Sequence, residues 1–301
     1  MAEKNVAEIL ITGATGNVGR ELVKQLSTRK VPFRAMIRSM KDATALAAVA
    51  GAEIVVGDFD DAESLARALQ GMKRVFLLTN SSERAETQQL TFVETARRAG
   101  AKHIVKLSQW AASTDSPVRF LRYHAAVEAK IKDSGIAYTF LRPNLFMQGL
   151  LGLRETIIAQ GKFFAAIGEA RISAIDVRDI GAAGAAALTE EGHQGRTYNL
   201  TGPQALSHGE MAEKLSAVLG RRIEFVGIPP EVMREVLLGA RVPVWQADGL
   251  IEDYAHYSRG EAAEVARGVQ DATGQPPRCF EEFASDYAPA FCEPTAQTTS
   301  A

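Results

Sequence analysis

Short apolar runs alternate with amphipathic stretches along the first half of the chain. The runs have the length and two-sided hydrophobicity of strands buried in a parallel sheet, and the stretches between them carry apolar residues at helical spacing. Strands are expected at residues 8–12, 32–37, 53–57, 73–78, 103–108 and 137–142. Helices are expected near residues 17–29, 42–49, 61–70, 84–99 and 119–134. This alternation predicts an α/β fold with a doubly wound parallel sheet, the Rossmann fold.

Residues typical of helix ends support these boundaries. Asp60 and Asp61 precede a helical stretch and are expected to cap it, and Gly71, Gly100 and Gly135 fall where helices should stop.

The pattern changes beyond residue 150. A helix from Asp176 to about residue 188 precedes a strand at 197–200, which is expected to return to the sheet. Further helices are expected near 207–219, 230–239 and 246–267, with a short strand at 222–226. We therefore predict a dinucleotide-binding domain over 1–150, a smaller and mostly helical C-terminal substrate-binding lobe over 151–292 that interleaves with the sheet, and a disordered tail over 293–301.

The turn after the first strand contains three glycines, Gly13, Gly16 and Gly19. Glycines at this spacing let a strand turn tightly into a helix, and a Cβ there would hold a diphosphate away from the backbone. The open amides and positive dipole end of the helix then favour an anion. This context favours a dinucleotide site over a plain turn. The residues expected to contact the cofactor here are Gly13, Thr15, Gly16, Asn17, Val18 and Gly19.

Composition narrows the class of protein. The 301 residues are 46% hydrophobic and 23% charged with a formal net charge of −2, so no basic stripe for nucleic acid is present. No signal peptide or 18-residue apolar span is recognised, and two cysteines are too few for a disulfide framework. The five histidines show no metal-ligand spacing. We expect a cytoplasmic, metal-free protein that is a monomer or homodimer and binds neither nucleic acid nor membrane.

The second strand is followed by Arg38, where NAD-binding folds place an acidic residue for the ribose 2′-hydroxyl. A guanidinium suits a 2′-phosphate, so NADP(H) is the expected cofactor. The alternative is an ordinary surface arginine. Lys41 could reach the same phosphate or simply face solvent.

Polar residues follow the next strands, at the edge where ligands bind in such sheets. Asp58 could accept a hydrogen bond from the adenine amine or serve only as a turn residue. The other residues expected along the cofactor are Phe59, Thr79, Asn80, Ser108 and Pro143. Several of these side chains could instead only satisfy loop backbone.

The chain resembles the NmrA-like group of atypical short-chain dehydrogenases over roughly residues 8 to 230. The matching pieces are the glycine turn, Arg38, Gly57-Asp58 and the segments 134–144, 176–180 and 198–203. This group includes quinone, azo-dye and triphenylmethane-dye reductases as well as NADPH-dependent redox sensors. The resemblance implies a Rossmann fold, NADP(H) binding and a substrate pocket closed by the segment after residue 142.

One departure concerns the catalytic pair of ordinary short-chain dehydrogenases, Tyr-x-x-x-Lys. Tyr123 is followed four residues later by Val127, so the lysine is absent. In the related isoflavone-reductase branch the active-site lysine aligns with His124, which resemblance places near the nicotinamide. A histidine can donate a proton near neutral pH, and Glu128 one turn later is expected to orient it and favour its charged form. A surface pair is the alternative. The candidate catalytic residues are His124, Tyr123 and Ser108.

Apolar residues near the strand ends suggest a flat slot for an aromatic ring. The candidate substrate residues are Trp110, Asn144, Phe146 and Met147, and Trp245 and Tyr254 could join from the C-terminal lobe. Aromatic residues at such positions could equally be core. Asp176 and Asp179 are better explained as a cap and first-turn acid of a helix than as paired catalytic carboxylates.

These features favour an NADPH-dependent oxidoreductase that passes hydride to a planar conjugated acceptor, such as a quinone or an aromatic dye. Alignment and water exclusion would contribute more than acid–base catalysis. A non-enzymatic NADP(H)-sensing regulator is the alternative, since it needs the same glycine turn and Arg38.

Overall fold

Seven parallel strands form the central sheet of the computed structural model, which describes residues 7–292. The strand order is β3-β2-β1-β4-β5-β6-β9, and every pair is parallel. The strands are β1 (Ile9–Ile11), β2 (Phe33–Ile37), β3 (Ala52–Val56), β4 (Arg74–Leu77), β5 (His103–Leu107), β6 (Ala137–Pro143) and β9 (Arg196–Leu200). The predicted doubly wound sheet is confirmed, including the strand that returns from the second half of the chain.

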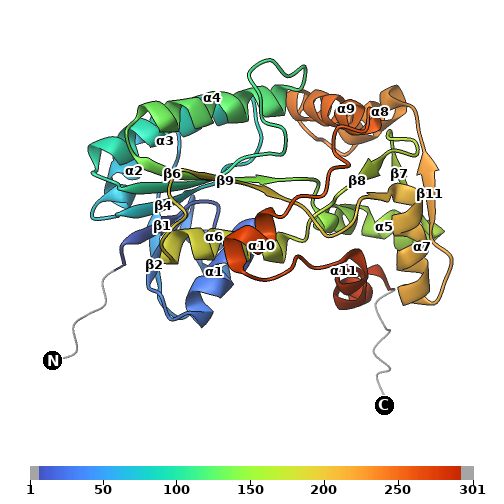
Figure 1. The fold of residues 1–301 in the computed structure, drawn as a ribbon, viewed down its shortest axis with the longest axis horizontal. Helices are drawn as coiled ribbons and strands as arrows, with labels where there is room; N and C mark the ends of the chain where they lie inside the picture. Colours follow the sequence, from blue (N-terminus) through green and yellow to red (C-terminus); the bar gives the residue numbers. More distant parts are fainter. Residues whose placement is uncertain (1–6, 293–301) are drawn as a thin grey trace, which may run out of the picture.

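Helices cover both faces of this sheet (Figure 1). One face carries α1 (Asn17–Thr28), α6 (Val177–Thr189) and α10 (Gly268–Thr273). The other face carries α2 (Ala62–Leu69), α3 (Ala85–Arg98) and α4 (Arg119–Asp133). The strand order reverses beside β1, so the carboxyl ends of β1 and β4 border the crevice in which ligands of such sheets bind.

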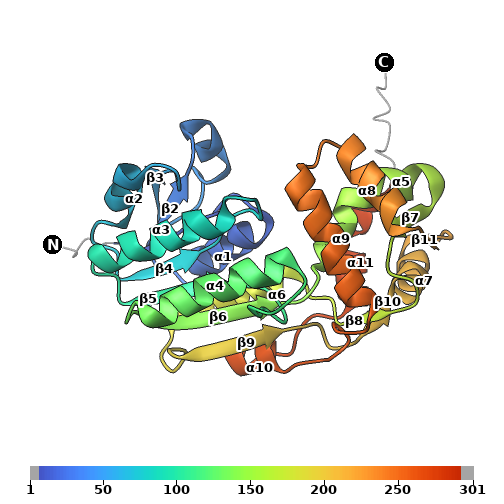
Figure 2. The same ribbon diagram turned by 90° about the horizontal axis from the view of Figure 1, so that it is seen from above.

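A second lobe lies beyond the carboxyl ends of the strands (Figure 2). Two small sheets belong to it: β7 (Lys162–Ala165) pairs with β11 (Glu224–Gly227), and β8 (Arg171–Ile172) pairs with β10 (Leu206–Ser207). Its helices are η2 (Met147–Leu153), α5 (Arg154–Gln160), α7 (His208–Leu219), α8 (Pro230–Gly239), α9 (Val244–Ser258), α11 (Phe280–Tyr287) and η3 (Ala288–Phe291). No helix within residues 7–292 is long and apolar enough to cross a membrane.

Several predicted helix ends are confirmed. The Asp61 carboxylate accepts hydrogen bonds from the first-turn amides of α2, and Gly71, Gly100 and Gly135 have positive φ angles just after α2, α3 and α4. The prediction that Asp60 also caps α2 is wrong, because its carboxylate pairs with Arg84.

Two predicted helices are wrong in extent. The stretch at 42–49 forms only the 3-10 helix η1 (Met40–Ala45), and the helix expected to reach residue 267 ends at Ser258. Gly260 at φ +79° reverses the chain there, and α10 and α11 follow as separate helices. The predicted tail at 293–301 lies outside the described residues.

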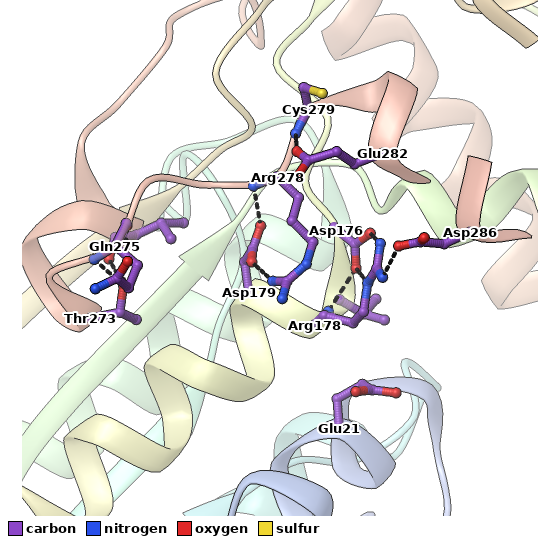
Figure 3. A network of polar contacts seen from close by, with 12 residues as sticks. Glu21, Asp176, Arg178, Asp179, Thr273, Gln275, Arg278, Cys279, Glu282 and Asp286 are labelled. Carbon is purple, nitrogen blue, oxygen red and sulfur yellow. Dashed lines mark hydrogen bonds and ion pairs between the residues drawn. The ribbon is translucent and has the colours of Figure 1, made fainter. Parts of the chain in front are cut away.

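Ion pairs connect the start of α6 to the C-terminal segment that contains Arg278 and Asp286 (Figure 3). The Asp176 carboxylate caps α6 by accepting a hydrogen bond from the Arg178 amide, and the Arg178 guanidinium bridges Asp176 and Asp286 of α11. Asp179 is engaged in the same way by Arg278. The prediction that Asp176 caps this helix and that Asp179 is its first-turn acid is therefore confirmed.

Candidate functional site

In the turn between β1 and α1, neighbouring atoms lie so close to the backbone at two positions that only glycine fits there. Gly13 has φ +66°, and a Cβ on it would lie 2.8 Å from Cγ of Leu78. A Cβ on Gly19 would lie 2.0 Å from the carbonyl oxygen of Gly13. The two glycines thus let the turn pack against Leu78 just after β4, and let the first turn of α1 pack against the backbone of Gly13.

The N-terminus of α1 is open. Gly16 is the N-cap residue and has no side chain to bond the first-turn amides, and no side chain within residues 7–292 caps the helix. Amides in the first turn of a helix have no partner within the helix, so they are available to an anion. This geometry fits the diphosphate of a dinucleotide.

Arg38 lies one residue beyond β2, beside the glycine turn. Its side chain is exposed and forms no ion pair among residues 7–292. By contrast, Arg34 on the same strand is bonded to Glu53. An uncommitted guanidinium at this edge of the sheet fits a 2′-phosphate. Lys41, also exposed, is the second residue of the 3-10 helix η1 that follows.

Asp58 is exposed at the end of β3, and one of its oxygens accepts a hydrogen bond from the Asp60 amide at 2.9 Å. The structure therefore shows the turn role and leaves the second oxygen free for the predicted adenine contact. Phe59 packs against Phe92, with ring centroids 5.5 Å apart.

A cavity of about 340 Å³ runs from the start of α1 to the second lobe. Eight of the predicted site residues line it: Asn17, Thr79, Ser108, Tyr123, His124, Pro143, Asn144 and Phe146. Ten further residues complete the wall: Leu78, Ser81, Leu107, Gln109, Phe120, Leu145, Gly149, Leu250, Asp253 and Tyr257. Its volume and mixed wall, mostly apolar with a few polar groups, are typical of small-molecule sites. No cluster of metal-ligating side chains exists in the described part of the chain.

His124 is bonded to Lys106, which the sequence analysis did not single out. Lys106 is fully buried on β5, and its Nζ lies 2.9 Å from Nδ1 of His124. Burial lowers the pKa of His124 well below its usual value, and the charges of Lys106 and Arg142 lower it further. The ring is therefore neutral at physiological pH. A lysine inside a strand expected to be apolar on both faces was the sequence signal that could have revealed this contact.

The expectation that Glu128 orients His124 and favours its charged form is wrong. Ser108 donates a hydrogen bond to Glu128 at 2.5 Å, and Arg142 from β6 donates to both oxygens of the same carboxylate. Glu128 is thus paired with Arg142, and His124 is hydrogen-bonded to Lys106 instead. The hydrogen bond to Glu128 also uses the Ser108 hydroxyl proton, although the Ser108 side chain still borders the cavity.

Tyr123 lies beside His124, with ring centroids 4.1 Å apart, and its hydroxyl is 3.0 Å from Oγ of Ser81. Burial raises the pKa of the Tyr123 phenol, partly opposed by the Ser81 hydrogen bond. A neutral phenol fits a positioning or donor role better than that of a base. Thr79 lines the cavity and accepts a hydrogen bond from Gln89, whereas Asn80 is exposed outside the wall.

The predicted aromatic slot is not assembled as expected. Phe146 lines the cavity, but Trp110 points into a separate core and donates its indole proton to the Glu261 carbonyl. Met147 lies in the apolar core of the second lobe. The Asn144 amide borders the cavity but donates both its protons to Ser173 and a backbone carbonyl.

The second lobe contributes α9 to the cavity, through residues the sequence did not reveal. Asp253 accepts hydrogen bonds from Gln109 and Tyr257, and burial raises its pKa to about 6. Trp245 packs on Phe120 behind the wall. Tyr254 packs with Tyr257 and likewise lies outside the lining. No local motif marks α9, since only the tertiary fold brings it over the sheet.

Comparisons with known proteins agree with this geometry. The model of the NmrA-like family matches residues 5–283. The chain is 38% identical to the NAD(P)H azoreductase of Xenophilus azovorans, over 94% of this chain and 99% of that protein. The NADPH complex of an Escherichia coli quinone oxidoreductase superposes with a TM-score of 0.83 at 28% identity, covering 93% of this chain and 99% of that one. Citrobacter triphenylmethane reductase with NADP(H) gives 0.82 at 30% identity and the same coverages.

Proposed function

The chain belongs to the NmrA-like family, and from this premise we propose that it is an NADPH-dependent oxidoreductase that reduces planar conjugated acceptors. Quinones and aromatic dyes are the acceptor classes. The proposal is supported by an azoreductase relative at 38% identity and by reductase neighbours solved with NADPH or NADP(H). Because these relatives and neighbours are reductases, they favour an enzyme over a non-enzymatic sensor, and we propose no second function as a sensor.

We base the proposal on one observation, the cavity that joins the open N-terminus of α1 to the second lobe. Its α1 end suits the cofactor diphosphate. Its far end has apolar walls from Phe120, Phe146 and Leu250, which suit a flat ring. A protein that only sensed the cofactor would not need this additional space.

When bound, NADPH supplies a hydride to the acceptor. The protein contributes alignment: the glycine turn and Arg38 hold the nucleotide, and the cavity walls orient the acceptor against it. His124 presents a neutral ring to the cavity, and α9 covers the far end and excludes water. The small-molecule acceptor is the partner this site requires.

The test is NADPH consumption by the purified protein with a panel of quinones, azo dyes and enones. We expect acceptor-dependent oxidation of NADPH, faster than that of NADH, and none with Gly16→Val as the matched control. If no acceptor in the panel accelerates NADPH oxidation although NADPH binds, the enzymatic proposal is wrong.

A further inference from the structure

Lys106 has three hydrogen-bond partners in a fully buried position. Its Nζ lies 2.8 Å from Oε1 of Gln89, 3.1 Å from the Leu107 carbonyl oxygen and 2.9 Å from Nδ1 of His124. An ammonium group has three protons and no lone pair, so these partners match its donors one for one.

Two of the three partners can only accept. The Leu107 carbonyl has no proton, and Gln89 uses its amide nitrogen to donate to Thr79, which turns Oε1 toward Lys106. A charged Lys106 must then donate to Nδ1 of His124. The ring proton is thereby placed on Nε2.

Nε2 of His124 is the ring atom left for a ligand. It has no hydrogen-bond partner among the residues that the structure describes. It is also not completely enclosed by protein atoms. The His124 side chain lines the cavity. A proton on Nε2 therefore faces the space where an acceptor would lie.

The charges around the pair disfavour a second proton on the ring. Lys106 and Arg142 supply two positive charges, whereas Glu128, which faces them from α4, supplies one negative charge. Tyr123, which packs on the His124 ring, stays neutral because burial raises its pKa. Asp253 lines the same cavity from α9, and because burial raises its pKa to about 6 its carboxylate adds a negative charge above that pH, which offsets the positive excess in the cavity.

We infer that Lys106 is a positioning residue that fixes the proton of His124 on Nε2, so that the neutral ring donates a hydrogen bond to the oxygen or nitrogen that becomes negative as an acceptor takes up hydride. This inference rests on the proposed reductase function. It deepens it by naming the acceptors that need this donor: quinones and azo compounds, whose reduction creates an anion. A cationic triphenylmethane dye becomes neutral on accepting hydride and needs no such donor.

The same donor count predicts a pH-dependent change. A neutral amine has two protons, which its two accept-only partners require, and its lone pair would then accept a proton from Nδ1 of His124. Burial lowers the pKa of Lys106 to about 7, opposed by the Glu128 charge. Loss of the ammonium proton therefore moves the ring proton from Nε2 to Nδ1 and removes the donor from the cavity.

The first test is ¹⁵N NMR of histidine-labelled protein, with the His124 signals assigned by their loss in His124→Asn. We expect a neutral Nε2–H ring at about pH 6 and a growing Nδ1–H population by about pH 9. An Nδ1–H or doubly protonated ring at pH 6, or a tautomer that does not change with pH, overturns the inference. This readout needs no turnover, so it is independent of the proposed function.

The second test compares acceptor classes in Lys106→Met and in Lys106→Gln, which retains an N–H donor. In Lys106→Met we expect kcat for a quinone to fall by about tenfold or more, while kcat for a cationic triphenylmethane dye and the Kd of NADPH change by less than about twofold. Lys106→Gln should recover part of the loss. In the wild type we expect quinone turnover to decline at alkaline pH, when Lys106 loses its proton, and this decline should be absent in both variants.

Exposed Lys102, just before the same strand, gives the control Lys102→Met, which should leave both activities unchanged. Equal losses for quinone and cationic dye in Lys106→Met would show a merely structural lysine and overturn the inference. If the Lys106 variants do not fold, the wild-type NMR result decides.

Discussion

At the scale of a single residue, Arg38 is the side chain to which we assign the preference for NADPH. It stands exposed at the carboxyl end of β2 with no ion-pair partner in residues 7–292, so binding a phosphate there breaks no existing contact. A guanidinium can form two charge-assisted hydrogen bonds with a phosphate.

Replacing Arg38 with Ala should weaken NADPH binding by about 1.5–3 kcal/mol while changing NADH binding little, because only NADPH has the 2′-phosphate. Calorimetric Kd values for both nucleotides measure this difference. Arg98→Ala, which removes the same charge from the far end of α3, is the control and should not discriminate. Equal weakening of both nucleotides by Arg38→Ala would contradict the 2′-phosphate assignment.

Individual residues also mark the limit of what the sequence could predict. Gly13 and Arg38 could be proposed as site residues because their types are unusual at those places in a repeating pattern, whereas His124 was proposed from the resemblance to the isoflavone-reductase branch. The partner of His124 was not, since the Lys106 contact joins β5 to α4 and depends on how the helix packs on the sheet. Helical spacing instead predicted Glu128 as the partner, but its carboxylate is paired with Arg142 from β6.

At the scale of an element, we propose that nucleotide binding depends on the turn into α1. An ideal Cβ on Gly16 would meet no atom closer than the Gly13 carbonyl oxygen at 3.4 Å, and its backbone is extended at φ −78°. A side chain is therefore tolerated by the fold at this position, whereas it would cover the open amides.

Gly16→Val should abolish detectable dinucleotide binding while circular dichroism and the unfolding midpoint stay near those of the wild type. Gly13→Val is the contrasting variant, because a positive φ and the Leu78 contact make it destabilising as well. Retained nucleotide affinity in a folded Gly16→Val protein would remove this turn from the site.

The α1–α6 contact is the second element that fixes the site. A Cβ on Gly181 would lie 2.9 Å from backbone atoms of Glu21 and Leu22, so α6 packs directly on the backbone of α1. The position of the α1 N-terminus thus depends on a glycine in the second half of the chain.

Gly181→Ala should lower the free energy of unfolding by about 1–3 kcal/mol, because α1 must move to admit the methyl group. Gly209→Ala in α7, where the nearest atom is 3.6 Å away, is the matched control and should be neutral or stabilising. Urea unfolding compares the two. A Gly181→Ala protein as stable as the control would show that the helices have room to adjust.

At the scale of the whole molecule, the sheet and its covering helices followed from the sequence because each element repeats a local pattern. The second lobe was harder to predict. Its short strands β7, β8 and β10 and helices α5 and α11 have too few residues to show a period, and they are stabilised by contacts distant in sequence, such as Arg178 with Asp286. The helix α9 itself was predicted, but the wall that it adds to the cavity was not, because its cavity residues meet the sheet domain only through contacts distant in sequence, such as Asp253 with Gln109.

Buried histidines should make the whole protein sensitive to acid. Burial lowers the pKa of His103 and of His208 to about 4. Above about pH 6.5 the folded and unfolded rings are both neutral; between 6.5 and 4 only the unfolded rings bind protons, so stability falls as pH falls. Each of these two rings contributes up to about 3 kcal/mol to this loss of stability. Asp253 acts in the opposite direction, because its pKa is raised to about 6 and the folded protein therefore binds this proton before the unfolded chain does.

Urea unfolding at several pH values between about 7 and 4 should therefore show a falling free energy of unfolding. His208→Phe should make this fall shallower, because His208 lies among Phe163, Phe225 and Tyr254 and phenylalanine suits that surrounding. A slope identical to that of the wild type would show that His208 does not contribute.

The central claim, that the open turn at the start of α1 binds a phosphorylated nicotinamide nucleotide, is tested most directly by calorimetric titration of the folded protein with NADPH. We predict saturable binding with one nucleotide per chain, tighter than for NADH, and a rise in melting temperature at about 1 mM NADPH. No heat of binding and no rise in melting temperature at that concentration would contradict the account.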